Sequence, residues 1–143
     1  MNNTTMKDEQ IESLAKWAKI ETEDIEELDY DHYGLKVLEI DGYEYAIGTY
    51  EDVKIAAYEY IKNSVWAFNS WFIADHTTAD IDTDIIEMIQ EKCENGNDAF
   101  LRLIDDLDEF VDDAISADGL GHFMATYDSD EIEIDNLYLY RIN

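Results

Sequence analysis

The chain has 143 residues, with 36 Asp or Glu against 9 Lys or Arg, and its formal net charge is -27. Phosphate and anionic lipid repel such a protein, so neither direct nucleic-acid binding nor membrane binding is expected. Hydrophobic residues make up 46% of the sequence and aromatic residues 13%, a composition unlike that of acidic disordered tails. We therefore expect one folded domain, residues 1–143, with its carboxylates on the surface.

Further classes of protein are disfavoured by what the sequence lacks. A single cysteine, Cys93, excludes an internal disulfide and suits a reducing compartment. No run of about 18 apolar residues is present, and the first residues lack the pattern of a signal peptide. These features favour a cytoplasmic protein.

The first half of the chain predicts helices around a hairpin. Apolar residues at helical spacing predict an amphipathic helix over residues 7–20, and residues 22–31 predict a short acidic helix. Residues 35–40 and 43–49 are rich in β-formers and flank Asp41-Gly42, a preferred pair for a two-residue hairpin turn. A further helix is expected over residues 51–63.

The second half predicts more helices and a closing strand. Residues 64–77 suggest a central helix or a broken continuation of the preceding one, and a helix is expected over residues 81–93. Another should run from residue 97 or 98 to about Ala117. Residues 120–127 are compatible with a strand, and residues 137–142 with a terminal one.

The fold class that follows is α+β, in a single domain. We expect an antiparallel sheet, made of the hairpin 35–49 and the C-terminal strand, packed against several helices.

The strongest chemical pattern lies in the expected helix over 98–113. Its carboxylates at i, i+3, i+4 and i+7 share one face, with two more at the flanks, and residues 103–135 contain no Lys or Arg. Six carboxylates over about 12 Å approach the charge density of B-DNA, which is about one charge per 1.7 Å of axis. We predict that this face binds a partner through Asp105, Asp106, Asp108, Glu109, Asp112 and Asp113.

Metal binding is weighed against simpler explanations. Asp80, Asp82 and Asp84, with Glu91 at the twelfth position, echo a calcium loop, but Ile85 stands where that loop needs glycine. Carboxylates at a helix start explain the pattern better. The three histidines stand apart without helical ligand spacing, and one cysteine is too few for a structural zinc site. No metal and no cofactor are therefore predicted.

Catalysis is not predicted either. The sequence has no nucleophile elbow, P-loop or dinucleotide fingerprint. Carboxylate pairs that suit acid–base work occur throughout, so their presence says little. The aromatic residues of segment 58–72 are read as core rather than as a ligand cage, and comprise Tyr58, Tyr60, Trp66, Phe68, Trp71 and Phe72.

Three blocks of sequence carry a resemblance. They are residues 60–69 with Trp66-Ala67-Phe68-Asn69, residues 106–123 with Asp106-Leu107-Asp108-Glu109-Phe110-Val111, and the C-terminal Tyr140-Arg141-Ile142-Asn143. Over residues 34–143 the chain resembles a group of small acidic bacteriophage proteins in which these blocks recur in order. The resemblance implies a phage gene product made in a bacterial cytoplasm. In charge and size the chain is also similar to phage antirestriction and anti-CRISPR proteins that mimic DNA.

The function that these observations favour is inhibition by mimicry of nucleic-acid phosphate. The partner would be a basic nucleic-acid-binding protein of the bacterial host, such as a defence nuclease, a CRISPR effector or a regulator, and the protein itself would not be an enzyme. Three alternatives remain open: a metal-dependent enzyme, an acidic virion or assembly protein, and a halophilic globular domain.

Overall fold

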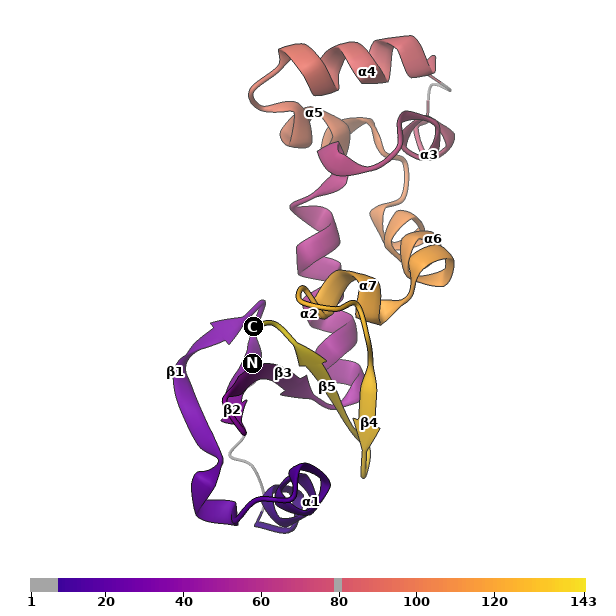
Figure 1. Cartoon of the computed structure of the whole chain (residues 1–143). Coiled ribbons are helices and arrows are strands. Elements are labelled where there is room, and N and C mark those ends of the chain that lie inside the picture. The colour runs from indigo at the N-terminus through magenta and orange to yellow at the C-terminus, as the bar shows by residue number, and fades with distance from the viewer. Residues whose placement is uncertain (1–7, 79–80) are drawn as a thin grey trace. The chain divides into compact units, whose positions relative to one another are not determined.

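A computed structural model describes residues 8–78 and 81–143 (Figure 1). The chain divides into two compact units. We call residues 1–57 with 118–143 the sheet unit and residues 58–117 the helical unit, and in each case refer only to the described residues. The helical unit is therefore one continuous segment inserted between two segments of the sheet unit.

The sheet unit contains five described strands, all paired antiparallel, in the order β1-β2-β3-β5-β4. This confirms the predicted α+β class, the hairpin and the C-terminal strand. The strands are β1 (Glu26–His32), β2 (Leu35–Ile40), β3 (Tyr43–Gly48), β4 (Ile132–Ile134) and β5 (Leu137–Arg141).

Each hairpin of the sheet turns through two residues with positive φ. Asp41 and Gly42 have φ of 54° and 85°, as a type I′ turn requires. Tyr33-Gly34 joins β1 to β2 and Asp135-Asn136 joins β4 to β5 with the same sign of φ. The turns set which residues of neighbouring strands pair, and this determines on which face of the sheet each side chain lies.

Helices cover both faces of the sheet. On one face Leu14 of α1 (Asp8–Ala18) joins a buried cluster with strand residues Leu38, Ile40, Tyr45, Ile47, Leu137 and Leu139. On the other face α7 (Leu120–Met124) contacts β5, and His32 of β1 donates through Nε2 to the Met124 carbonyl at 3.1 Å. Gly121 is needed there, because a Cβ would lie 2.7 Å from the Ser129 carbonyl oxygen.

The helical unit consists of short helices around an aromatic core. After the last turns of α2 (Tyr50–Lys62) come the 3-10 turn η2 (Val65–Ala67), α3 (Ser70–Asp75), α4 (Thr83–Lys92), α5 (Gly96–Leu103) and α6 (Leu107–Asp118). The sequence thus left open a choice over residues 64–77 that the structure resolves as broken helices. The rings of Phe68, Phe72, His76 and Phe110 contact one another, and Phe100 is fully buried.

Two of the predicted elements are wrong. The acidic helix expected over residues 22–31 is a 3-10 turn η1 (Thr22–Asp24) followed by β1, because β2 offers β1 a pairing edge that outweighs its poor β-propensity. Residues 120–127, which were judged compatible with a strand, instead begin with helix α7 (Leu120–Met124). Its Leu120, Phe123 and Met124 are buried, which places the apolar residues at helical spacing.

The long helix expected over residues 98–117 is also wrong, since it is two helices. Ile104 takes an extended conformation and pairs with Thr77 in an isolated antiparallel bridge. The Thr78 amide donates to the Leu103 carbonyl, and the Asp105 amide donates to the His76 carbonyl at 2.9 Å. These tertiary hydrogen bonds replace the helical ones and end α5 at Leu103.

Candidate functional site

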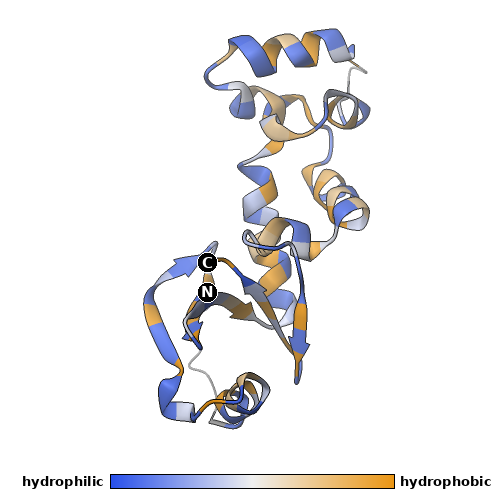
Figure 2. Ribbon diagram, viewed as in Figure 1, coloured by the Kyte–Doolittle hydropathy of each residue, from blue (hydrophilic) through white to orange (hydrophobic). Residues whose placement is uncertain are grey.

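Helix α6 carries two adjacent rows of exposed carboxylates, which we call the acidic face. Asp108 and Asp112 form one row and Glu109 and Asp113 the other, each at i, i+4 spacing. The opposite side of the helix is apolar, with Phe110, Val111 and Ala114 buried (Figure 2). Asp108 and Glu109 lie in the first turn, where the helix dipole favours negative charge.

Asp105 and Asp106 precede α6, which corrects the prediction that all six carboxylates lie on one helix, while their role in partner binding stays a prediction. The carboxylate of Asp105 accepts a hydrogen bond from the Thr78 hydroxyl at 3.1 Å. Asp106 precedes α6, and its Oδ1 accepts the backbone N–H of Glu109 at 3.2 Å, as an N-cap does. Both are exposed, but their observed contacts fix the α5–α6 junction.

The acidic face has its own contacts within the helical unit. Tyr58 is hydrogen-bonded to Asp108. The pKa of the Tyr58 phenol is raised, mainly by burial and secondly by the negative charge of Asp108. Asp113 accepts a hydrogen bond from His76 Nε2 at 2.8 Å. The face is therefore anchored to the aromatic core at two points, one in each row.

His76 is brought to α6 by the bridge between residues 77 and 104. It follows α3 directly, and its ring contacts the rings of Phe72 and Phe110 at centroid distances of 4.7 and 5.1 Å. Its side chain is only 9% exposed. Nδ1 donates to the Phe72 carbonyl at 2.8 Å, and Nε2 points at Asp113.

Both ring nitrogens of His76 therefore face acceptors, which favours the protonated ring. Burial alone lowers the pKa of His76, but the hydrogen bonds to Phe72 and Asp113, with the negative charges of Asp113 and Glu109, raise it by more. The net pKa lies above the ordinary value of about 6.5. The pair is thus charge-assisted, with an imidazolium as donor and a carboxylate as acceptor.

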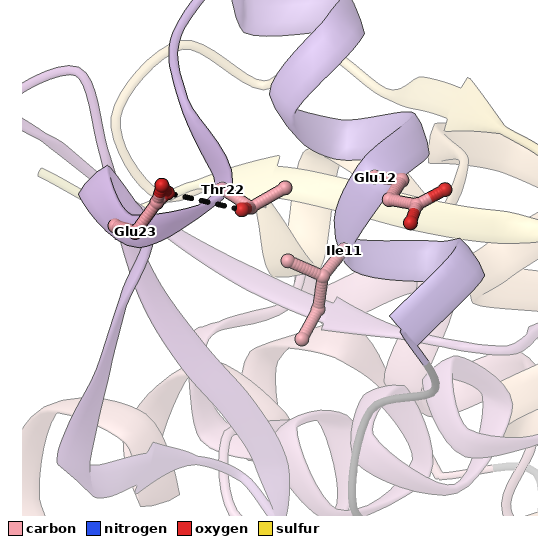
Figure 3. A pocket seen from close by; sticks show the side chains of 4 residues that line it. All are labelled: Ile11, Glu12, Thr22 and Glu23. Carbon is pink, nitrogen blue, oxygen red and sulfur yellow. Dashed lines mark hydrogen bonds between the residues drawn. The ribbon is translucent and has the colours of Figure 1, made fainter.

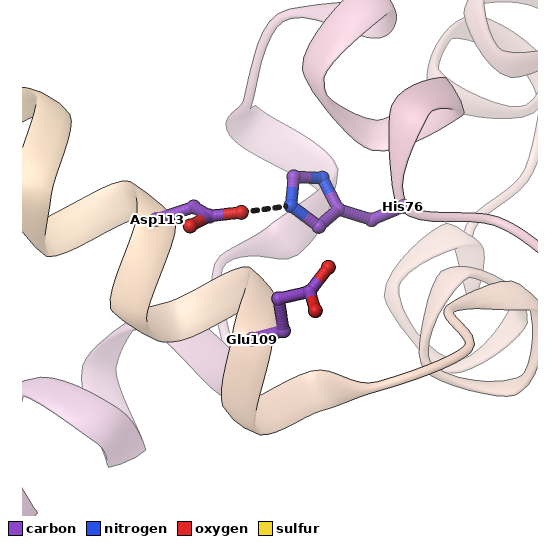
Figure 4. Close-up of side chains that lie close together, drawn as sticks. All are labelled: His76, Glu109 and Asp113. Carbon is purple, nitrogen blue, oxygen red and sulfur yellow. Dashed lines mark hydrogen bonds and ion pairs between the residues drawn. The ribbon is translucent and has the colours of Figure 1, made fainter.

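Glu109 completes a possible ligand set with this pair. One donor atom each from His76, Glu109 and Asp113 lie within 4.8 Å of one another, and both carboxylates extend from α6 toward the imidazole (Figure 4). No pattern in the sequence indicated this site, because His76 is 33 residues from Glu109 and no spacing rule connects them. The sequence indicated only the carboxylates of the site, through their i, i+4 spacing.

Comparisons with protein-family models, with curated proteins and with solved structures find no match for this chain. The site is therefore interpreted from its own geometry. Within residues 8–78 and 81–143, no helix is long and apolar enough to cross a membrane.

Two surface hollows of about 310 Å³ each offer little chemistry by comparison. One, in the sheet unit, is lined by Ile11, Glu12, Thr22 and Glu23, and the Thr22 hydroxyl donates to the Glu23 carboxylate (Figure 3). The other, in the helical unit, is lined by Trp66, Gln90, Cys93, Glu94, Gly96 and Asn97. There the amides of Gln90 and Asn97 are engaged with backbone groups of η2 and α2.

Two further predictions concern the aromatic residues assigned to the core and the calcium-like pattern. Phe68 and Phe72 are partly buried as core residues, but Trp66 and Trp71 are 53% and 57% exposed, which contradicts their assignment to the core. In the calcium-like pattern Asp80 lies outside the described residues, and Thr83 begins α4, so Asp84 belongs to a helix rather than to a loop. The structure thus favours the helix-start explanation.

Proposed function

We propose that this protein binds and blocks a basic nucleic-acid-binding protein of a bacterial host by presenting carboxylates in place of phosphates. The partner would be a defence nuclease, a CRISPR effector or a regulator, met in the host cytoplasm. The observation that carries the proposal is the acidic face of α6: four exposed carboxylates in two rows on one rigid helix.

The charge spacing on this face suits a phosphate-binding groove. Asp108 and Asp113 are five helical rises apart, about 7.5 Å along the axis. The three axial intervals between these four charges average about 2.5 Å, against about one charge per 1.7 Å of B-DNA. A groove that neutralises phosphates with Lys and Arg would meet a similar density, and opposite fields would speed association.

The helical unit also exposes an aromatic side chain, Trp71 of α3, which would offer a partner an apolar anchor. Trp71 contacts Phe72, and the ring of Phe72 contacts Phe110 of α6. Trp and Tyr dominate the binding energy of many interfaces because they bury a large area at small entropic cost. A partner surface with a shallow apolar pocket beside its basic groove would fit this arrangement.

The test is capture from a bacterial lysate with competition by duplex DNA. The tagged protein should retain a basic nucleic-acid-binding protein that elutes in a salt gradient and is released by added duplex DNA. Replacing Asp108 and Asp112 by Asn should lower the eluting salt concentration, because one row of the face loses its charge while the His76 contact stays intact.

A matched control removes the same number of charges from the sheet unit. Glu26 and Asp29 on β1 are exposed, and the variant Glu26→Gln/Asp29→Asn loses two charges there. If this control weakens capture as much as the α6 variant does, net charge rather than the acidic face determines binding. If duplex DNA fails to compete, the mimicry proposal is wrong.

A further inference from the structure

We infer that His76, Glu109 and Asp113 form a binding site for a divalent transition-metal ion, with Zn²⁺ as the ion of choice. The inference goes beyond the proposed function and does not depend on it. It rests on the imidazole of His76, whose side chain is 9% exposed, and on two exposed carboxylates of α6 whose oxygens lie within 4.8 Å of its nitrogen.

The orientation of His76 is what separates this site from a mere group of acidic residues. A backbone carbonyl only accepts hydrogen bonds, so the contact with Phe72 at 2.8 Å places a hydrogen on Nδ1. In protein metal sites the ligating histidine commonly donates its other ring N–H to such a group, which fixes the tautomer and the ring direction. Nε2 is thereby aimed at the carboxylates by a contact outside the cluster.

The surroundings hold the imidazole rigidly. Its ring lies against Phe72 and Phe110 and is 91% buried, so a ligand contributed here costs little side-chain entropy on binding. Glu109 and Asp113 come from successive turns of one helix, so their spacing is fixed by the backbone. Two elements that are held together by the Thr77–Ile104 bridge thus supply three ligands.

The metal ion replaces the Nε2 proton that His76 donates to Asp113, and this proton is released to solvent. The distances then need only small side-chain movements. Metal–ligand bonds of about 2.1 Å in a tetrahedral site place the ligand atoms about 3.4 Å apart. His76 Nε2 and Asp113 Oδ2 are 2.8 Å apart, and all three donor atoms lie within 4.8 Å of one another. The carboxylates are exposed, and rotation of their side chains covers the difference.

The ligand types select the class of ion. Calcium and magnesium take oxygen ligands almost entirely, whereas one imidazole with two carboxylates suits Zn²⁺, Co²⁺ or Mn²⁺. Among these Zn²⁺ should bind most tightly by the general order of stability. Three protein ligands leave further coordination positions for water, as in open zinc sites.

The first experiment titrates metal-free protein with ZnCl₂ by calorimetry near neutral pH. One ion should bind per chain, and a large excess of CaCl₂ should not displace it. In Glu109→Gln/Asp113→Asn the dissociation constant should rise at least tenfold, as loss of ligands requires. The matched control Asp108→Asn/Asp112→Asn removes the same charge from the neighbouring row and should bind within about threefold of the unchanged protein.

The second experiment needs no substitution, so it remains decisive if a variant fails to fold. In ¹⁵N-labelled protein, ZnCl₂ should shift the Nε2 resonance of His76 to a metal-bound value while the ring nitrogens of His32 and His122 stay unchanged. The variant Cys93→Ser should bind equally, because the exposed thiol is not a ligand. An unshifted His76 resonance, equal weakening in both row variants, or loss of binding in Cys93→Ser would overturn the inference.

Discussion

The sheet unit and the helical unit have nearly the same charge density but use their carboxylates differently. Residues 58–117 contain 15 Asp or Glu and 3 Lys or Arg, and the rest of the chain contains 21 and 6. In the sheet unit Glu27 contacts Lys36, Glu44 contacts Tyr30, and Glu131 accepts from Tyr140 at 2.5 Å. In the helical unit carboxylates gather in rows on α6. Geometry, rather than the amount of charge, therefore distinguishes a candidate binding face.

The largest expected effect tests whether the two units unfold separately. Phe110 is fully buried among the rings of the helical unit, so Phe110→Ala should cost about 3–5 kcal/mol of unfolding free energy. Phe123 of α7 is the matched aromatic in the sheet unit, 4% exposed. In hydrogen exchange, each variant should remove protection mainly from amides of its own unit. Uniform loss across the chain would show one cooperative unit instead.

A smaller change in unfolding free energy is expected at Asp106, and it tests whether this carboxylate has a structural role or belongs to the acidic face. Asp106→Ala removes the side-chain cap of α6 and should cost about 1 kcal/mol in chemical denaturation. Asp106→Asn keeps an acceptor and should cost only a few tenths of that. Neither change should reduce partner capture if α6 is intact at the assay temperature. A loss of capture in Asp106→Asn would return this residue to the binding face.

The two units also contain histidines with opposite responses to pH. In the sheet unit, burial lowers the pKa of His32 below about 6.5, although Met124 and Asp31 act against it. In the helical unit the pKa of His76 is raised. Linkage then gives stability slopes of opposite sign near neutral pH.

For His76 the folded chain binds the proton more tightly than the unfolded chain does. Its contribution is fully present below about pH 6.5 and is lost as the pH rises through the folded pKa. For His32 the contribution is present above about pH 6.5 and is lost as the pH falls toward the folded pKa. The measurement is chemical denaturation at several pH values with a chelator present. The fall in unfolding free energy with rising pH should disappear in His76→Gln, and the fall with decreasing pH should disappear in His32→Gln. Equal slopes in the variants and the unchanged protein would contradict both assignments.

The smallest effect concerns repulsion along α6. Asp108→Asn/Asp112→Asn removes one like-charge i, i+4 pair, worth about 0.2–0.5 kcal/mol, but also the charge that the helix dipole favours at Asp108, so the net change in unfolding free energy should stay within about 0.5 kcal/mol. Added salt, to about 0.1 M, should stabilise the unchanged protein and shrink that difference, while partner capture weakens. Thermal melts across a salt series provide the measurement. Unfolding at low salt with stability only in molar salt would instead support the halophilic alternative.

Local signals in the sequence predicted the elements that local interactions determine. Asp41-Gly42 indicated the hairpin because this pair favours a type I′ turn, whose positive φ at both positions matches the twist of the two flanking strands. The helix over residues 51–63 was also predicted, and in α2 the side chains of Val53, Ala56, Ala57 and Ile61, which recur at helical spacing, are fully buried. In these segments propensity, pattern and tertiary environment agree.

The elements that sequence reasoning missed depend on distant partners. The acidic segment Glu26–His32 is a strand because β2 pairs with it, although Tyr33-Gly34 was a readable turn signal. Ile104 leaves the helix because Thr77, 27 residues earlier, pairs with it. The same bridge places His76 beside α6. The three side chains are therefore brought together by a long-range contact, which hydrophobic periodicity cannot reveal. Four of the six carboxylates proposed for partner binding lie on α6, and their binding role stays a prediction.

The insertion of the helical unit has a consequence for synthesis on the ribosome. β3 ends at Gly48 and its partner β5 begins at Leu137. The edge of β3 that pairs with β5 therefore stays unpaired while residues 49–136 are synthesised. At about 5–20 residues per second that wait is on the order of ten seconds. The meander β1–β3 and the helical unit can form from contiguous sequence during it. Residues 132–141 then complete the sheet, and a nascent chain stalled before them would expose a strand edge open to aggregation.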